Sequence, residues 1–333
     1  MAPPDPTAPT TTPNPNHHAT HLAAAQPLFA LLGRTAVVTG GTKGIGAACT
    51  VELAALGCRV LFCARTATDI ESCEREWRAM GYDVQGVAAD VSKPEGVRAV
   101  AEQAAAFCRG GGASNDNTTS SPQLDVLVLN AGTNVQLPTV EYDLPRHYEE
   151  IVGTNLGAPI ALAQALHPLL TAAQGGGAGG GGDGAENDNN AAPSSVVLVS
   201  SVAGGPLAGR SGLLYGASKA ALNHVARLLA AEWGGGARQP AGDGTTPPPP
   251  LPPRRVRVNA VAPWVTLTDM GMQNLARDPS AEARLLERTP LGRLAAPGDV
   301  ASAVAWLASP KLSSYVTGQV LAVDGGYSVK GYW

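Results

Sequence analysis

Charged and aromatic residues are scarce in this chain of 333 residues: 15% are Asp, Glu, Lys or Arg, and 5% are Phe, Trp or Tyr. The formal net charge of −4 offers no basic surface of the kind that binds nucleic acid or an anionic membrane. No apolar run reaches the roughly 20 residues that a membrane-spanning helix needs. We therefore expect a protein that binds neither nucleic acid nor membrane.

Cysteine pairs are missing as well. The chain has five scattered cysteines, an odd number, without the Cys-x-x-Cys spacing of a zinc site or redox motif: Cys49, Cys58, Cys63, Cys73 and Cys108. This pattern is typical of reduced thiols rather than of a disulfide framework. We expect a cytoplasmic location.

The first 30 residues contain no Lys or Arg and are rich in Pro, Thr and Ala, which predicts a disordered tail. A cleavable transit peptide is usually rich in Arg, so organelle targeting is the less favoured interpretation of this tail. His17, His18 and His21 lie in it without other candidate ligands. We therefore expect no metal site.

Short apolar segments rich in β-branched residues alternate with longer helical stretches along the rest of the chain. The predicted strands are Thr35–Thr39, Arg59–Cys63, Val84–Ala88, Asp125–Leu129, Ser195–Val199, Val256–Val261 and Gln319–Val323. The predicted helices include Ile45–Leu56, Gly96–Cys108, Ile160–Leu170 and Ala217–Trp233. Nearly continuous apolar strands separated by helices favour a parallel sheet covered on both faces. The sequence thus predicts an α/β protein: one Rossmann-type, doubly wound domain of about seven strands over residues 31–333. The run from Ser92 to Glu95 also predicts a capping box at a helix start.

Three low-complexity stretches, at residues 109–122, 174–192 and 234–253, interrupt this domain. Each follows a predicted helix and precedes a predicted strand, so each belongs at the amino ends of the parallel strands. Ligands of such sheets bind at the carboxyl ends. Glycine-rich inserts can also bind nucleic acid, but these have almost no aromatic residues and little positive charge. We expect solvated loops away from the functional site.

A glycine turn follows the first predicted strand, with Gly40, Gly44 and Gly46 spaced as in a phosphate-binding turn. Glycines there permit a tight turn and a close approach of the backbone to a pyrophosphate, and the next helix offers its free N–H groups. A glycine cluster alone also serves ordinary turns. The position between a strand and a helix favours dinucleotide binding. Thr42, Lys43 and Ile45 complete the turn.

The second strand runs into Arg65, where an enzyme specific for NAD carries an acidic residue that binds the ribose 2′-hydroxyl. An arginine at this position suits the 2′-phosphate of NADP instead. Lys43 is a candidate for a second cation at this phosphate. The alternative is that both are ordinary surface charges. We expect NADP(H) as cofactor.

Further motifs recur in a known order along residues 31–333. They are Asn130-Ala131-Gly132, Ser200-Ser201, Tyr215-Gly216-Ala217-Ser218-Lys219 and Asp324-Gly325-Gly326. With the glycine turn, they make the chain resemble the short-chain dehydrogenase/reductase family. Finer motifs resemble its tropinone reductase-like branch: Gly132-Thr133-Asn134-Val135, Pro138-Thr139-Val140-Glu141-Tyr142, Ala262-Pro263-Trp264 and Arg288-Thr289-Pro290-Leu291-Gly292-Arg293.

Tyr215 and Lys219 are four residues apart and share one face of a predicted helix. An isolated phenol has a pKa of about 10, and a nearby ammonium lowers it. Tyr215 can then act as general acid in carbonyl reduction and as general base in alcohol oxidation. The resemblance implies that Ser201 binds the substrate oxygen, with Ser200 as the alternative because the spacing to Tyr215 is one residue longer than usual. It also implies that Asn155 supports a proton relay.

The resemblance implies several cofactor contacts besides the glycine turn and Arg65. They are Asp90 and Val91 near the adenine, Asn130, Ala131 and Gly132 along the cofactor, Tyr215 and Lys219, and Pro263, Val265 and Thr268 near the nicotinamide. Trp264 is interpreted either as a pocket wall or as a packed aromatic residue.

These features predict an NADPH-dependent enzyme that reduces a ketone of a small, mostly apolar substrate to an alcohol, reversibly. The alternatives are a 3-oxoacyl-thioester reductase and a non-catalytic NADP-binding sensor or scaffold. The motifs of a serine hydrolase are absent. Substrate specificity is expected in residues 134–137 and 267–288. The alanine-rich helices near Asn155 and Tyr215 imply a homodimer or homotetramer, as in the family.

Overall fold

The computed structural model describes residues 31–110, 122–172, 192–206, 211–235, 254–276 and 280–330. The predicted tail at residues 1–30 lies outside these ranges, as do the interiors of the three predicted inserts.

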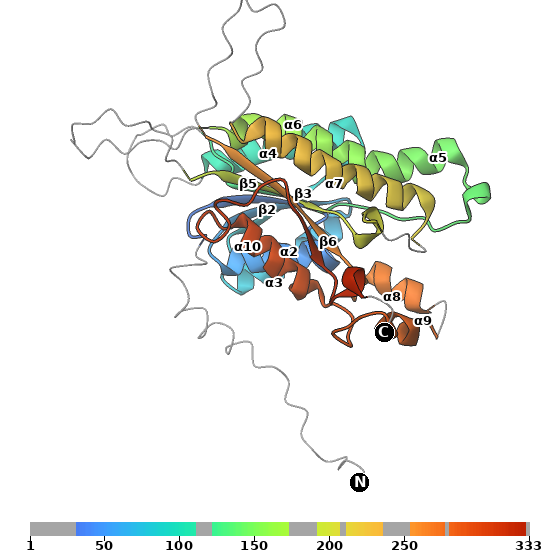
Figure 1. Ribbon diagram of the computed structural model, residues 1–333. Helices are drawn as coiled ribbons and strands as arrows, with labels where there is room; N and C mark the ends of the chain where they lie inside the picture. Colours follow the sequence, from blue (N-terminus) through green and yellow to red (C-terminus); the bar gives the residue numbers. More distant parts are fainter. Residues whose placement is uncertain are drawn as a thin grey trace, which may run out of the picture.

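The core of the molecule is a seven-stranded parallel sheet with the strand order β3-β2-β1-β4-β5-β6-β7 (Figure 1). Its strands are β1 Thr35–Thr39, β2 Arg59–Ala64, β3 Val84–Ala88, β4 Val126–Leu129, β5 Ser194–Val199, β6 Val256–Pro263 and β7 Val320–Val323. The predicted Rossmann-type sheet is confirmed, and the predicted strand ends are wrong by two residues at most.

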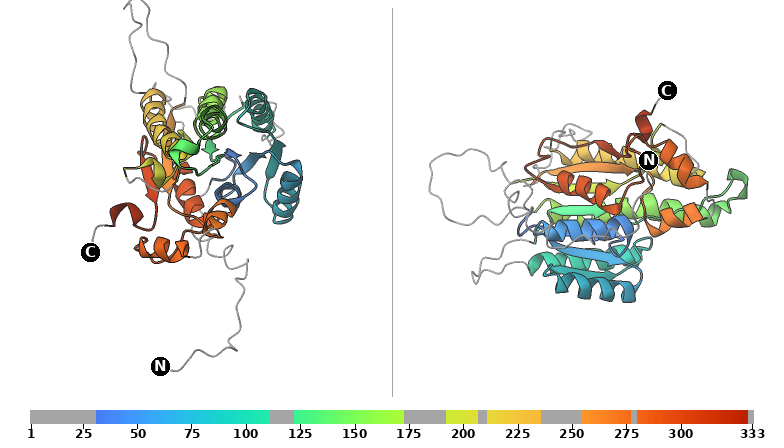
Figure 2. Two further views of the ribbon diagram at one scale, coloured as in Figure 1. Left: turned by 90° about the vertical axis from the view of Figure 1, so that its right-hand side faces the viewer. Right: turned by 90° about the horizontal axis from the view of Figure 1, so that it is seen from below.

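Helices cover both faces of this sheet, as the views in Figures 1 and 2 show. One face carries α4 Pro94–Arg109, α6 Ala158–Leu170 and α7 Leu213–Trp233; the other carries α2 Gly44–Ala55, α3 Ala67–Ala79 and α10 Pro297–Ala308. Shorter helices gather at one end of the sheet: α5 Leu144–Tyr148, α8 Asp269–Ala276 and α9 Ala281–Glu287. The π-helix η2 Glu149–Gly157 joins α5 to α6, and the 3-10 turns are η1 Thr139–Glu141, η3 Val202–Gly204 and η4 Tyr327–Val329.

The alternation of side chains along each strand divides the apolar core in two. In β1, Val37 packs with the α4, α6 and α7 side of the sheet, whereas Ala36 and Val38 pack with the α2, α3 and α10 side. Successive side chains of a strand point to opposite faces, so a strand buried on both faces must be apolar throughout. This requirement explains why the strands read as continuous apolar runs.

A buried ion cluster occupies the amino edge of the sheet. Arg254 donates to the Asp125 carboxylate at 2.7 Å, to the Ala192 carbonyl at 2.7 Å and to the Leu124 carbonyl at 3.1 Å. Arg34 donates to the same carboxylate at 3.0 Å. Arg254, Ala192 and Leu124 each lie within three residues after the undescribed interior of one of the three predicted inserts. The described flanks of the inserts therefore meet at the edge that the sequence predicts for them.

The predicted capping box is wrong. Lys93 is the N-cap of α4 and makes no side-chain cap, and Ser92 instead donates its N–H and its hydroxyl to the Asp90 carboxylate. The Asp90 carboxylate, two residues before Ser92, is a strong local acceptor. Ser92 therefore donates to Asp90 and does not cap the helix. Ser92 thus belongs to the short turn after β3 and not to the start of α4.

No helix in the described part of the chain is long and apolar enough to cross a membrane. Residues 31–330, in the ranges given above, also contain no group of three or more His, Cys, Asp or Glu side chains suited to a metal ion. His17, His18 and His21 lie outside the described residues.

Candidate active site

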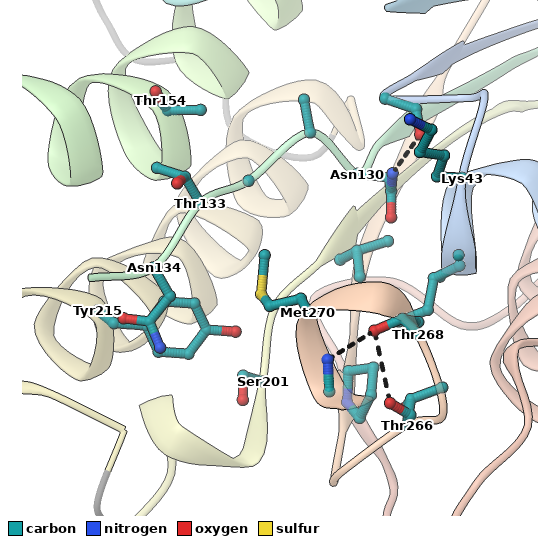
Figure 3. Close-up of a pocket in the computed structure, with 18 of the residues that line it drawn as sticks. Lys43, Asn130, Thr133, Asn134, Thr154, Ser201, Tyr215, Thr266, Thr268 and Met270 are labelled. Atoms are coloured by element: carbon teal, nitrogen blue, oxygen red, sulfur yellow. Dashed lines mark hydrogen bonds between the residues drawn. The ribbon is translucent and has the colours of Figure 1, made fainter. Parts of the chain in front are cut away.

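A cleft of about 1650 Å³ opens at the carboxyl ends of the strands and gathers the segments that follow β1 to β6. Among the predicted site residues, all line it except Gly46 and Asn155. Pockets for one drug-sized ligand span roughly 300–1,000 Å³. The larger volume fits a dinucleotide together with a small substrate. Figure 3 shows part of this cleft.

The glycine turn between β1 and α2 has the backbone that the sequence predicts. Gly40 and Gly44 have φ values of 64° and 55°, a region that side chains with a Cβ rarely adopt. A Cβ on Gly46 would lie 2.0 Å from the Gly40 carbonyl oxygen. Only glycine fits these positions, and the turn presents the start of α2 to the cleft. The residues therefore fit a pyrophosphate.

Asn130 fixes this turn from the neighbouring strand. Its Nδ2 donates to the carbonyl oxygens of Thr39 at 2.8 Å and Gly40 at 3.1 Å. The Thr39 hydroxyl accepts in return from the backbone N–H groups of Asn130 and Ala131, at 2.9 and 3.0 Å. Sequence reasoning missed Thr39. Its signal is a buried hydroxyl at the end of an otherwise apolar strand.

The expected cations at the far end of the cleft differ in their surroundings. Arg65 is exposed and lines the cleft, and in the described part of the chain it forms no ion pair. Lys43 Nζ instead lies 2.8 Å from the Asp69 carboxylate, and this hydrogen-bonded pair raises the pKa of Lys43. Arg65 is therefore the better placed of the two for a phosphate.

Asp90 and Val91, after β3, line the same end of the cleft. Burial by itself would raise the pKa of Asp90, but the hydrogen bonds from Ser92 and the charge of Arg65 lower it overall. The carboxylate is thus ionised beside Arg65.

Tyr215 and Lys219 lie on α7, with Lys219 Nζ 5.7 Å from the centre of the Tyr215 ring. Lys219 is buried, which lowers its pKa to about 8, and its Nζ donates to the Val199 carbonyl at 2.8 Å. Burial raises the pKa of Tyr215, against the lowering expected from Lys219, and a hydrogen bond with Ser201 acts in the opposite direction. Ser200 is turned away and donates to the Lys219 carbonyl at 3.1 Å. Of the two serines, Ser201 is the one that meets the phenol.

Asn155 is fully buried in the π-helix η2 and ties the cleft floor to α7. Its Oδ1 accepts from the Thr133 N–H at 2.8 Å, and its Nδ2 donates to the Thr133 carbonyl at 2.9 Å and to Ser218 Oγ at 3.2 Å. Ser218 Oγ donates to the Tyr215 carbonyl at 2.7 Å. Asn155 thus aligns the Thr133 loop with the first turn of α7. Short π-helical segments are rare and frequent at functional sites.

Pro263 ends β6, and the chain then crosses the cleft through Val265 to Thr268, whose Oγ1 accepts from the Gly271 N–H at 3.2 Å (Figure 3). Trp264 lines the cleft and stacks on Tyr327 with ring centres 3.6 Å apart. Its indole N–H donates to Thr289 Oγ1 at 3.2 Å. Trp264 is therefore both a packed aromatic residue and a wall of the cleft. Both predicted specificity segments contribute lining residues, among them Asn134, Gln136, Met270 and Leu285.

Comparison with known proteins agrees with this site. Residues 34–178 match the family model described as short chain dehydrogenase, and residues 250–328 match one described as Enoyl-(Acyl carrier protein) reductase. The chain is 38% identical over 305 residues to a tropinone reductase homolog of Arabidopsis thaliana, covering 91% of this chain and 96% of that protein. A tropinone reductase homolog of Datura stramonium is 33% identical over 307 residues, 91% and 95% of the two chains.

Among solved structures, the RhlG/NADP active-site complex of Pseudomonas aeruginosa is similar at 31% identity with a TM-score of 0.71, and the match covers 91% of this chain and 99% of that one. The predicted family, fold and enzyme class are confirmed. The chain belongs to the short-chain dehydrogenase/reductase family, in its tropinone reductase-like branch, and is an oxidoreductase that uses NAD(P)(H).

Proposed function

We propose that this protein is an NADPH-dependent reductase that converts a ketone of a small, mostly apolar substrate to an alcohol, in a reversible reaction. The observation that carries the proposal is the meeting of Ser201, Tyr215 and Lys219 in the cleft that also contains the glycine turn and Arg65.

Each residue has a role that follows from its surroundings. The glycine turn binds the pyrophosphate, and Arg65 binds the 2′-phosphate. Ser201 donates a hydrogen bond to the carbonyl oxygen of the substrate and holds it beside Tyr215. NADPH, when bound in this cleft, would supply the hydride to the carbonyl carbon. Tyr215 gives its phenolic proton to the oxygen, so that the ketone becomes an alcohol and the cofactor is oxidised.

The acid–base balance of the site supports the reductive direction. The raised pKa of Tyr215 keeps the phenol protonated near neutral pH, which suits a proton donor. The buried ammonium of Lys219 lies close to the ring and favours the phenolate that forms after transfer. Asn155 acts as a positioning residue through Thr133 and Ser218. The predicted proton relay through Asn155 stays a prediction.

The choice of NADP over NAD rests on the end of β2. No carboxylate follows this strand directly, and the nearest in sequence, Asp69, is bound to Lys43. An exposed arginine without an ion pair suits a phosphate better than a ribose hydroxyl.

A 3-oxoacyl-thioester reductase is the competing proposal, because Arg146, Arg284 and Arg288 line the cleft. An acidic carrier protein would dock on a basic rim. Carboxylates of Glu149, Glu150 and Asp269 line the same cleft, however, so the rim is of mixed charge. This mixture favours a free small molecule. The retained Tyr215 and Lys219 likewise favour an enzyme over a non-catalytic sensor.

The test is the oxidation of NADPH, followed by its absorbance, with purified protein and a panel of cyclic, aliphatic and β-keto carbonyl compounds and acyl thioesters. Turnover of free ketones with NADPH well above that with NADH supports the proposal. Tight binding of NADPH without turnover of any carbonyl would favour the sensor, and turnover of carrier-bound thioesters alone would favour the competing reductase.

We also propose a homodimer or homotetramer that pairs through the outer faces of α6 and α7. Ile160, Leu213 and Leu228 expose 42%, 55% and 56% of their surface there, and an exposed apolar stripe on two long helices suits a second copy. Light scattering at micromolar concentration tests this, and a monomer mass with full activity would contradict it. The free thiols support a reducing compartment such as the cytoplasm, which a fluorescent fusion would test.

A further inference from the structure

Asn134 occupies a distinctive position in the substrate half of the cleft. It lines the cleft together with Tyr215 and Ser201, which Figure 3 also labels. Its Oδ1 is buried without a hydrogen-bond partner, and within the described residues its Nδ2 has no partner either. Because Asn134 lines the cleft and its Nδ2 has no partner in the described part of the chain, this N–H group is available to a ligand that enters the cleft.

The backbone on both sides of Asn134 is held firmly. The Asn155 side chain accepts from the Thr133 N–H at 2.8 Å and donates to the Thr133 carbonyl at 2.9 Å. Tyr142 donates its hydroxyl to the Val135 carbonyl at 2.9 Å. A loop that is fixed before and after one residue presents that side chain in a defined direction, as a binding site requires.

The same contacts put Asn134 next to the first turn of α7. Asn155 reaches Ser218, which is bonded to the Tyr215 carbonyl. On the other side of Asn134, a Cβ placed on Gly212, the N-cap of α7, would lie 3.3 Å from the Val135 carbonyl oxygen. Asn134 therefore lines the same part of the cleft as Tyr215 and Ser201, where the atoms next to the carbonyl of a bound substrate would lie.

The orientation of the Asn134 amide determines whether it presents Oδ1 or Nδ2 to a ligand in the cleft. With Oδ1 buried and unpaired, Nδ2 is the atom that remains accessible. The reverse orientation would bury an NH₂ group with two unpaired donors, at a greater cost than one carbonyl oxygen. Asn134 thus presents an N–H donor to the cleft, and the matching ligand group is an oxygen that accepts a hydrogen bond.

We propose that Asn134 determines substrate specificity by donating a hydrogen bond to a second substrate oxygen on the carbon next to the reducible carbonyl. The preferred substrate class is then an α-oxygenated ketone with an otherwise apolar body. This inference rests on the proposed reductase function and narrows its substrate class.

The test uses a matched pair of substrates, the α-methoxy and α-ethyl derivatives of cyclohexanone. The two have nearly the same shape, and the methoxy oxygen only accepts hydrogen bonds. Wild-type protein is expected to favour the methoxy compound about tenfold in kcat/KM, the effect of one hydrogen bond to an otherwise unpaired group. The α-oxygen also makes the carbonyl carbon more electrophilic, so the measurement that tests Asn134 is the change in the ratio of the two kcat/KM values. Asn134→Leu and Asn134→Asp both remove the N–H donor and should lower this ratio about tenfold relative to wild type.

A structural role for Asn134 would look different. It would lower the turnover of both ketones equally, or weaken NADPH binding and the melting temperature, whereas the proposal leaves cofactor affinity unchanged. Thr139→Val, an exposed change on the same loop outside the cleft, is the matched control and should keep the preference. A preference that is absent in wild type, or a ratio that is the same in Asn134→Leu as in wild type, overturns the inference.

The proposed function fails separately, if neither ketone nor any carbonyl of the wider panel is reduced. Calorimetric binding of the same two compounds to the protein saturated with NADP⁺ then tests Asn134. The methoxy compound must still bind about tenfold more tightly to wild type, and Asn134→Leu must lose that difference.

Discussion

Polar groups at the two edges of the sheet differ in whether they have partners within the protein. At the amino edge, the Asp125 carboxylate accepts from Arg34, Arg254 and the Thr35 N–H, and Arg254 is bonded through three of its nitrogens. At the carboxyl edge, Arg65 has no ion pair and Asn134 has no hydrogen-bond partner within the described residues. The charges of the Asp125 cluster are paired with each other, whereas Arg65 and Asn134 at the carboxyl edge are available to a ligand.

This difference separates stability from activity. Burying a charge is costly unless it is paired, so each charge of the amino-edge cluster depends on its partners. Polar groups of a binding site must keep donors or acceptors for substrate and cofactor. In the open cleft these groups can bond to water until a ligand replaces it. Changes at the carboxyl edge should therefore alter catalysis and binding, and changes at the amino edge should alter the free energy of unfolding.

The largest effect is expected from Tyr215→Phe. This change removes the transferable proton and keeps the ring, so kcat for ketone reduction should fall by about 10²–10⁴. The dissociation constant of NADPH and the free energy of unfolding should stay close to wild type. Steady-state kinetics and a fluorescence titration measure both, and near-normal turnover would remove Tyr215 from the proposed mechanism.

Asp125→Ala tests the amino edge. It leaves the fully buried Arg254 side chain without its counter-ion, which should lower the free energy of unfolding by about 3–5 kcal/mol. Asp83→Ala is the matched control, because Asp83 pairs with Arg59 at 3.0 Å but is 62% exposed, and it should lose at most about 1 kcal/mol. Equal losses in urea denaturation would mean that the buried cluster is no more important than a surface pair.

Lys219→Met tests the cost of a buried ammonium at the carboxyl edge. The pKa of Lys219 is about 8 in the folded protein against 10.5 for the free side chain. Between these values the unfolded chain binds the proton and the folded chain does not, so wild-type stability rises with pH in this window. The stability of Lys219→Met relative to wild type should therefore decline by about 2–3 kcal/mol from pH 8 to pH 10.5. A difference that is flat with pH would show that the folded pKa is not depressed.

Arg65→Asp tests the cofactor preference. A carboxylate facing the 2′-phosphate should raise the dissociation constant of NADPH by about 10- to 100-fold, the effect of losing one hydrogen bond between charged groups. NADH binding should change little or improve. Titration of both cofactors measures the ratio, and a wild-type protein that already prefers NADH would contradict the assignment.

The smallest effect is expected from shortening residues 175–190 to a short linker. These residues lie outside the described part of the chain, between α6 and β5 in the sequence. Loop length changes the entropy of closure only slowly, so kcat and KM should remain near wild type. A folded, NADPH-binding variant that has lost activity would show that the two edges are coupled.

Much of the fold and site is predictable from the sequence because the relevant signals are local. Gly40 and Gly44 can adopt a positive φ because glycine has no Cβ, and Tyr215 and Lys219 share a helix face because they are four residues apart. Apolar runs mark the strands because both faces of the sheet are covered. The roles of Ser200 and Ser201 are not determined locally. They depend on which hydroxyl bonds to the Lys219 carbonyl and which bonds to the Tyr215 phenol.

The partners of polar side chains are what only the tertiary structure decided. Asn130 bonds to the carbonyls of the glycine turn, 90 residues away along the chain, and Arg254 meets Asp125 across 129 residues. Lys43 is paired with Asp69, and Asn134 is left unpaired. A hydrogen bond depends on distances of about 3 Å between atoms that chain-distant segments bring together, and no residue pattern encodes that distance. The sequence by itself determined the strands, the turn, the family and the catalytic pair; packing decided which polar groups are left for the substrate.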